Sequence, residues 1–145
     1  MKYFKTYNTF INENLGNINL DFINKLNGDQ KTYYKYIYNN SKLIKTVDLK
    51  YDIQTTVKDC YNNAYKVSKT LNCDYVEGLI DMGGLIIFHA FNKIDNKYFD
   101  LTLDKNNYKY YSVFEINNKE LDKFFDSKNV KWELGSLAKY LKVIK

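Results

Sequence analysis

The fold is decided by two adjoining stretches, TVKDCYNNAYKVSKTLN at residues 56–72 and DYVEGLIDMGGLIIFHAFNKIDNKYFDLTL at residues 74–103. In the first, small and apolar side chains recur every three or four residues, which is typical of a helix with one buried face. The second is rich in β-branched and aromatic residues and is interrupted by short polar turns, which predicts strands. The strands are expected at 74–80, 85–92 and 98–103.

The helix expected over residues 56–72 has one continuous core-facing stripe. Thr55 or Thr56 is a suitable N-cap, because a hydroxyl oxygen can accept a hydrogen bond from an N–H group of the first turn. This start places Cys60 in the first turn or just after it. The stripe is formed by Val57, Cys60, Tyr61, Ala64, Val67, Ser68 and Leu71.

The last two of these strands are expected to form a β-hairpin. Asp95 and Asn96 lie between them and suit a two-residue turn. With that turn, His89 lies opposite Thr102, and His89 and Asp100 become diagonal neighbours on one face of the sheet. Their backbones are then about 7–8 Å apart, which is within side-chain reach.

The flanking segments complete an α+β arrangement, in which a helix bearing Cys60 packs on a mostly antiparallel sheet bearing His89 and Asp100. We interpret residues 1–145 as a single domain. It comprises a helix-rich N-terminal part (1–50), a catalytic-like core (54–115) and closing helices (117–145). Residues 31–38 fit either a strand or a helix. Further helices are expected at 19–26, with Gly28 beyond it as the stop signal, and at 134–144. A helix at 119–125 is expected to begin with a capping box of Asn117 and Glu120. A strand is expected at 110–116.

The composition gives a net charge of +5 from 22 basic and 17 acidic residues, and every basic residue is a lysine. The lysines are dispersed along the chain, which indicates a solvated surface, so nucleic acid is not expected as a partner. The longest apolar run, at residues 85–88, is far shorter than the roughly 20 residues that cross a bilayer, so no membrane partner is expected.

Only two cysteines are present, which is too few for a disulfide framework and is typical of a reducing compartment. The N-terminal residues lack the apolar stretch of a signal peptide. We therefore expect a cytoplasmic protein. The preference for residues with A/T-rich codons suggests a low-GC bacterial or phage source, with the host cytoplasm as the compartment in the second case.

The scarce residues limit the chemistry more than the abundant ones do. One histidine and two cysteines without a Cys-x-x-Cys pair do not provide the usual ligands of a metal site, so neither a metal nor any other cofactor is expected. A thiol nucleophile needs a group that favours the thiolate and a base held by a third group. A helix N-terminus at Cys60, with His89 as base and Asp100 as its orienting group, meets these needs. The alternative is that Cys60 is a small core residue and His89 a structural hydrogen-bonding residue.

Four blocks of this sequence, taken in order, resemble transglutaminase-like proteins within the broader class of papain-like thiol enzymes. The resemblance covers roughly residues 54–115. It departs from the family pattern in having Phe91 where Trp is usual and Leu101 where Pro is usual. The blocks are Cys60-Tyr61-Asn62-Asn63-Ala64, Tyr75-Val76-Glu77-Gly78, His89-Ala90-Phe91 and Asp100-Leu101-Thr102.

The resemblance implies Cys60 as nucleophile, His89 as general base and acid, and Asp100 as orienter. Papain-like enzymes also place an oxyanion-hole glutamine six residues before the nucleophile, and Gln54 has that offset. Glu77 and Phe91 are candidates for lining the cleft, although for Glu77 we expect an outward-facing position. Cys73 matches no motif and is interpreted as a core residue.

These residues together predict a thiol hydrolase or acyltransferase that attacks an amide or ester bond through a thioester acyl-enzyme. The substrate would be a protein, a peptide or a small amide. Two alternatives remain open. One is an inactive binding protein of the same fold, for example a phage factor acting on a host target. The other is a lysine-rich nucleic-acid binder, whose tyrosines would stack on bases.

Overall fold

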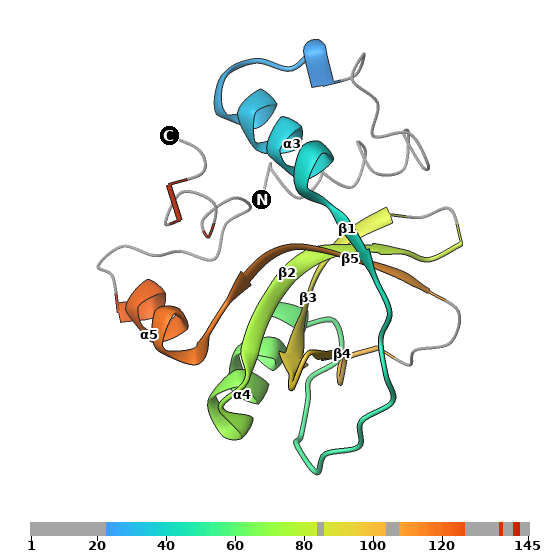
Figure 1. The fold of residues 1–145 in the computed structure, drawn as a ribbon, viewed down its shortest axis with the longest axis vertical. Coiled ribbons are helices and arrows are strands. Elements are labelled where there is room, and N and C mark those ends of the chain that lie inside the picture. The colour runs from blue at the N-terminus through green and yellow to red at the C-terminus, as the bar shows by residue number, and fades with distance from the viewer. Residues whose placement is uncertain (1–22, 84–85, 104–107, 127–136, 138–140, 143–145) are drawn as a thin grey trace.

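The chain forms an antiparallel sheet covered by helices, an α+β arrangement as the sequence predicts (Figure 1). The structure is a computed structural model, and it describes residues 23–83, 86–103, 108–126, 137, 141 and 142. The elements in chain order are α3 (Gly28–Asn40), β1 (Lys42–Ile44), α4 (Cys60–Leu71), β2 (Asp74–Asp81), β3 (Ile86–Ile94), β4 (Lys97–Phe99), β5 (Lys109–Ile116) and α5 (Asn118–Asp126).

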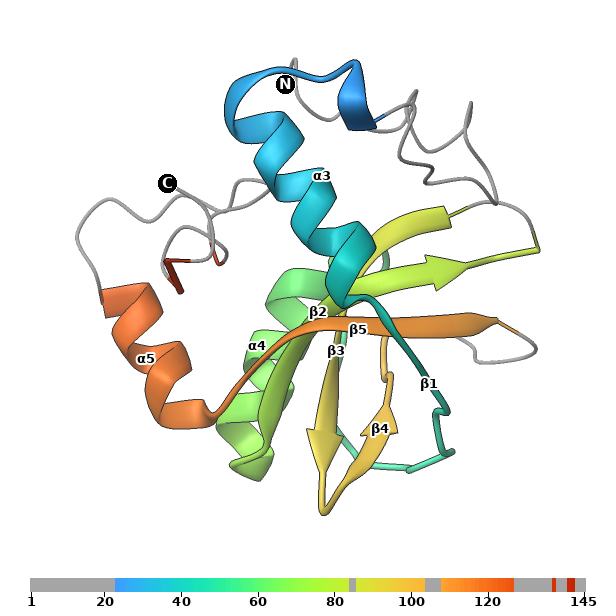
Figure 2. The same ribbon diagram turned by 45° about the horizontal axis from the view of Figure 1, so that its top comes forward.

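The five strands are ordered β1-β5-β2-β3-β4, and all neighbouring pairs are antiparallel. The sheet curls so strongly that the chain just after β1 reaches β4 at the opposite edge (Figure 2). Thr46 forms a parallel bridge with Tyr98, and the Val47 N–H donates a 2.8 Å hydrogen bond to the Tyr98 carbonyl. These contacts join the two edges of the sheet locally.

The two faces of the curled sheet carry separate cores, because successive side chains of a strand point to opposite faces. The convex face packs against α3, α4 and α5, and α4 lies against β2 and β3 (Figure 1). The inside of the curl is filled largely by aromatic rings. The helix-covered core includes Tyr33, Tyr34, Ile37, Ala64, Tyr75, Leu79, Ala90, Phe114, Ile116, Leu121 and Phe124, and the inner core includes Val76, Ile80, Phe91, Tyr98 and Tyr110.

The expected β-hairpin is confirmed in turn and register. Asp95 and Asn96 have φ values of 48° and 62°, and positive values at both turn residues are those of a type I′ turn. The register pairs Asn92 with Phe99 and Ile94 with Lys97, which is the pairing expected for a two-residue loop.

The strand predicted at 98–103 is wrong in its second half, because β4 ends at Phe99. The Asp100 carboxylate accepts hydrogen bonds from the backbone N–H groups of Thr102 at 2.8 Å and Leu103 at 3.4 Å. A side chain that bonds the backbone two residues ahead makes an Asx turn, which competes with the strand ladder. The residue predicted to orient His89 therefore also ends the strand.

The helix predicted to begin at residue 56 begins four residues later, at Cys60. Lys58 has a φ of 62°, a left-handed conformation that no helix contains. The Asn63 side chain holds the preceding segment outside the helix, since it bonds both the N–H and the carbonyl of Thr56, at 2.9 and 2.7 Å. Cys60 consequently occupies the first helical position, with Asp59 as N-cap.

The remaining expectations are met in part. Residues 31–38 are helical within α3, and Gly28 is the first residue of that helix rather than the end of one. Strand β1 lies in the part of the chain expected to be helix-rich. The strand at 110–116 is confirmed. Of the capping box, one half is present, because the Asn117 side chain accepts a 2.9 Å bond from the Glu120 N–H, while the Glu120 side chain accepts a bond from Lys123. Most of the helices predicted at 19–26 and 134–144 lies outside the described residues.

Gly78 is required where β2 meets an irregularity in its pairing with β5. The register shifts between Glu77 and Gly78, and a Cβ added at Gly78 would lie 1.8 Å from the Tyr111 carbonyl oxygen. No side chain fits there unless the two strands separate.

Gly78→Ala should therefore destabilise the protein by about 3 kcal/mol, because the clash is with the backbone of a central strand. Urea unfolding of both proteins measures the difference. Gly83→Ala is the control, since Gly83 has a φ of 74° but an added Cβ meets nothing within 4 Å. That variant should lose only about 1 kcal/mol. Equal losses at the two positions would contradict the close approach at Gly78.

Candidate functional site

His89 and Asp100 form a buried hydrogen-bonded pair, as the hairpin register predicts. His89 Nε2 lies 2.8 Å from Asp100 Oδ2, and the side chains are only 3% and 1% exposed. Asp100 occupies Nε2, so Nδ1 is the ring nitrogen left for another partner. The imidazole also packs over Phe91, with the rings stacked at 6.4 Å.

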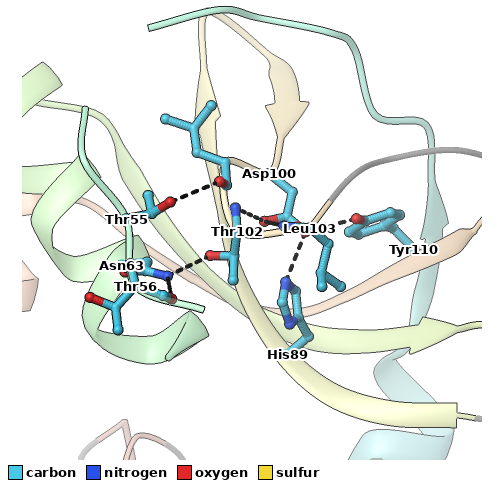
Figure 3. A network of polar contacts seen from close by, with 9 residues as sticks. Thr55, Thr56, Asn63, His89, Asp100, Thr102, Leu103 and Tyr110 are labelled. Atoms are coloured by element: carbon cyan, nitrogen blue, oxygen red, sulfur yellow. Dashed lines mark hydrogen bonds and ion pairs between the residues drawn. The ribbon is translucent and has the colours of Figure 1, made fainter. Parts of the chain in front are cut away.

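The Asp100 carboxylate has both oxygens fully engaged. Oδ2 also accepts a 2.7 Å bond from the Tyr110 hydroxyl, and Oδ1 accepts the Thr102 and Leu103 N–H groups (Figure 3). Burial alone would raise the pKa of Asp100, but hydrogen bonding and charge from His89, with Tyr110 and Thr102, hold that pKa below its ordinary value. Asp100 is thus a buried anion fixed in one orientation.

Cys60 completes the arrangement from the N-terminus of α4. Burial lowers the pKa of His89, but hydrogen bonding and charge from Asp100 and Cys60 outweigh it and raise that pKa to about 9. His89 therefore lies between the two acidic groups. The first N–H groups of a helix lack partners within the helix, and its N-terminus favours negative charge. The structure thus brings together the three residues that the sequence singled out.

A second network fixes the loop before Cys60 relative to the His–Asp pair (Figure 3). Asn63 is 4% exposed, and besides its two bonds to Thr56 its Nδ2 donates to Thr102 Oγ1 at 3.1 Å. Thr102 in turn donates its N–H to Asp100. The Thr55 hydroxyl donates to the Leu101 carbonyl at 3.4 Å. Through these bonds the loop before Cys60 and the Asp100 carboxylate share one hydrogen-bonded frame.

Helix α4 is also tied to the sheet by a buried amide. Asn92 is 1% exposed, and its Nδ2 donates to the carbonyls of Ala64 at 2.9 Å and Asp74 at 3.2 Å. One side chain on β3 therefore holds both α4 and β2. Since β3 also carries His89, this amide fixes the helix with Cys60 relative to the strand with the histidine.

Asn63, Asn92 and Tyr110 belong to the site frame but were not singled out from the sequence. Asn is abundant in this chain, and nothing in its spacing separates these two from the rest. Tyr110 lies inside a strand that was predicted, but its partner Asp100 is ten residues away in the chain. Thr102 had a signal, because it lies in the Asp-x-Thr block.

Cys73, unlike Cys60, is a buried residue of the core. It is 4% exposed, packs with Val67 and Phe99, and forms no disulfide. Burial, with the charge of Asp74, raises the pKa of its thiol to about 11. This position agrees with the interpretation of Cys73 as a core residue, and a buried protonated thiol is unreactive.

Gln54, the oxyanion-hole candidate, is exposed, whereas Phe91, a cleft-lining candidate, is buried. Gln54 is exposed in the loop before α4, and only its backbone carbonyl is bonded among the described residues, to Lys66 Nζ at 2.8 Å. Phe91 is 1% exposed inside the curl, packed on Tyr98 and Tyr110. The expectation that Phe91 lines the cleft is therefore wrong, because its position on β3 points it to the inner core beneath His89.

Glu77 is not an outward-facing residue in solvent, contrary to expectation. It lies in a narrow crevice on the helix-covered face, where its Oε1 accepts a 2.7 Å bond from the Tyr75 hydroxyl. Burial raises the pKa of Glu77 to about 7, and the bond from Tyr75 opposes that shift only in part. The alternation of side chains along a strand predicts which residues share a face of the sheet. It does not predict which of the two faces the helices cover.

The described residues contain no group of three or more His, Cys, Asp or Glu side chains placed to hold a metal ion. In the same part of the chain, no helix has both the length and the apolar character needed to span a membrane. No protein-family model, curated protein or solved structure matches this chain.

The single histidine permits a direct test of the buried pair. In an NMR titration, His89 should keep its proton at pH 7 and lose it near pH 9, above the ordinary value of about 6.5, because Asp100 and Cys60 stabilise the imidazolium. Asp100→Asn should lower this pKa by at least about 1 unit. A wild-type midpoint at 6.5 or below would contradict the ion pair.

Glu77 should make stability fall as pH rises. Its folded-state pKa of about 7 exceeds the ordinary value of about 4.3, so the folded protein holds this proton more tightly than the unfolded chain does. The contribution is complete below pH 4.3 and lost as pH passes 7. Glu77→Gln should therefore stabilise the protein by about 2 kcal/mol at pH 8 relative to its effect at pH 4.5.

Urea unfolding at the two pH values measures this difference. Glu120→Gln makes the same chemical change on the exposed surface of α5, where Glu120 pairs with Lys123, and should give nearly the same effect at both pH values. A Glu77→Gln effect independent of pH would show that Glu77 ionises normally.

Proposed function

We propose that this protein is a cysteine-dependent acyl-transfer enzyme, with Cys60 as nucleophile, His89 as general acid and base, and Asp100 as the residue that orients the imidazole. One observation carries the proposal: His89 is held by Asp100 at 2.8 Å through Nε2 while Cys60, at the first position of α4, interacts with the same ring. This division of roles is the one that nucleophilic catalysis requires.

The reaction proceeds through a thioester. The Cys60 thiolate attacks the carbonyl carbon of an amide or ester, and the carbonyl π electrons move to oxygen. Collapse of the tetrahedral intermediate breaks the bond to the leaving group, which takes a proton from the His89 imidazolium. Water or an amine then attacks the thioester, His89 accepts its proton, and the Cys60 thiolate is released.

The oxyanion formed in each step needs hydrogen-bond donors. The backbone N–H of Cys60 is suited to this role, because it is among the first N–H groups of α4. Gln54 remains the side-chain candidate. Since Gln54 is exposed in this structure, its amide would have to turn toward Cys60 when substrate binds.

A competing function is that of a binding protein that keeps this fold without activity, acting in a bacterial or phage-infected cytoplasm. The buried, fully bonded Asp100 favours the enzyme, because an Asp–His pair beside a thiol is not needed to fill a core. The dispersed lysines lend no specific support to nucleic-acid binding, and binding to single-stranded nucleic acid that falls steeply with salt would favour that function instead.

Alkylation by iodoacetamide should separate the two thiols. At pH 6.5, Cys60 should react at least about 100-fold faster than Cys73, because Cys60 lies beside the His89 imidazole at the N-terminus of α4 while the Cys73 thiol is buried with a raised pKa. Peptide mass mapping at timed intervals measures both rates in one sample. Asp100→Asn should slow Cys60 and leave Cys73 unchanged. Equal rates in the native wild-type protein would refute an activated Cys60.

The acyl-enzyme itself can be trapped with p-nitrophenyl acetate. In a Cys73→Ala background, Cys60 should gain one acetyl group with release of p-nitrophenol, and the thioester should then hydrolyse. Intact-mass measurement follows both steps. Cys60→Ala should show no acetylation, and His89→Ala should slow both steps by roughly 100-fold. Acetylation at the same rate in the His89→Ala variant would remove the general acid and base from the mechanism.

A further inference from the structure

The crevice that holds Glu77 lies on the same side of the molecule as the first turn of α4. Glu77 projects from β2, and Tyr61, the neighbour of Cys60, lines the same crevice. The charges of Glu77 and Cys60 both raise the pKa of Tyr61 and of Tyr75, which places the carboxylate and the thiol close to the same two rings. The crevice therefore adjoins the nucleophile. It is lined by Tyr33, Ile37, Tyr61, Glu77, Gly78, Phe88, Val113 and Phe114.

Among the described residues, Glu77 has no cationic partner. Its one hydrogen bond in the described part of the chain comes from the Tyr75 hydroxyl to Oε1, and no lysine contributes to its ionisation behaviour. The chain carries 22 basic residues, yet none of those described pairs with this carboxylate. An ionised carboxylate removed from water without a partner is costly, so a ligand that supplies positive charge would bind there favourably.

The walls of the crevice are aromatic. Tyr33 stacks on Phe88 at 6.0 Å and on Phe114 at 6.4 Å between ring centroids. Tyr61 and Phe88 are partly exposed, so ring surfaces border the opening. Aromatic faces attract organic cations, and they do so most strongly where water is excluded. A carboxylate framed by such rings has the chemistry of a site for an ammonium group.

We propose that Glu77, with Tyr33, Tyr61 and Phe88, forms a specificity subsite for a primary ammonium group on the substrate whose carbonyl Cys60 attacks. The inference rests on the proposed function, since it assigns a substrate class to the reaction at Cys60. It selects substrates in which a lysine side chain or a free amino group lies near the attacked carbonyl. The crevice has no room for a water-sized group in this structure, so the rings at its opening must shift before an ammonium group can enter.

Binding can be measured without any reaction at Cys60. In Cys60→Ala protein at pH 8, n-butylammonium should shift the backbone amide resonances of Tyr61, Glu77 and Phe114, whereas its neutral analogue n-butanol should not. Glu77→Gln should weaken the binding by at least about tenfold, because the charge is lost while the side-chain shape is kept. Glu120→Gln is the matched control and should bind as the parent does. Tyr75→Phe should also bind, since it keeps the Glu77 charge.

The pH dependence gives a second readout. Among the described residues, the titratable groups that interact with Glu77 are Tyr33 from α3, Tyr61 from α4 and Tyr75 from β2. The three tyrosines have pKa values raised by burial, so they stay neutral at pH 8. In the Cys60→Ala protein, binding should therefore strengthen from pH 6 to pH 8 as Glu77 ionises, and Glu77→Gln should abolish that dependence.

A competition experiment connects the subsite to the nucleophile. In Cys60-containing protein, n-butylammonium at ten times its Kd should protect Cys60 from iodoacetamide about tenfold. No binding, equal binding to the Glu77→Gln variant, or binding without protection would each overturn the subsite. If Cys60 proves unreactive while n-butylammonium binds through Glu77, the proposed enzyme fails and the cation site stands. If Cys60 is reactive and n-butylammonium does not bind, only the subsite fails.

Discussion

The Asp100 carboxylate is the group on which the candidate site depends most. Its two oxygens accept bonds from an imidazole, a phenol and two backbone N–H groups, and it is 1% exposed. A buried charge with this many donors has little freedom, since the loss of any donor would leave part of the charge unsatisfied. The same carboxylate ends β4, fixes the histidine and ties β5 to the hairpin through Tyr110. Local chain direction and site geometry are thus set by one side chain.

Around this carboxylate, buried amides take the place that salt bridges have in many proteins. Asn63 joins the loop before Cys60 to Thr102, and Asn92 joins α4 to β2 and β3. Amides can donate and accept without adding charge, so they can link backbone segments at lower desolvation cost than lysine pairs would. The ion pairs of lysine in the described residues, such as Lys69 with Asp122 and Lys93 with Glu115, lie nearer the surface.

The hairpin and α4 show which structural features a sequence pattern can predict and which it cannot. The hairpin register followed from Asp95 and Asn96 alone, because a two-residue turn fixes every pair behind it. The start of α4 could not be predicted from the sequence pattern, since the apolar stripe begins at Val57. The side chain of Asn63 and the left-handed conformation of Lys58 keep the preceding residues out of the helix, which begins at Cys60. Periodicity reports which face is buried. It does not report hydrogen bonds that a side chain makes to the backbone seven residues away.

The sequence by itself determined the order of the elements from α4 to α5, the hairpin that places Asp100 beside His89, and the position of Cys60 near a helix start. Each of these depends on local spacing and turn chemistry, which a single stretch of chain contains. Only the tertiary structure decided that α4 brings Cys60 to the same imidazole, that Phe91 lies beneath that ring, and that Glu77 lies among aromatic side chains rather than in solvent. These outcomes depend on the curl of the sheet and on which face the helices cover, and both result from packing between segments far apart in the chain.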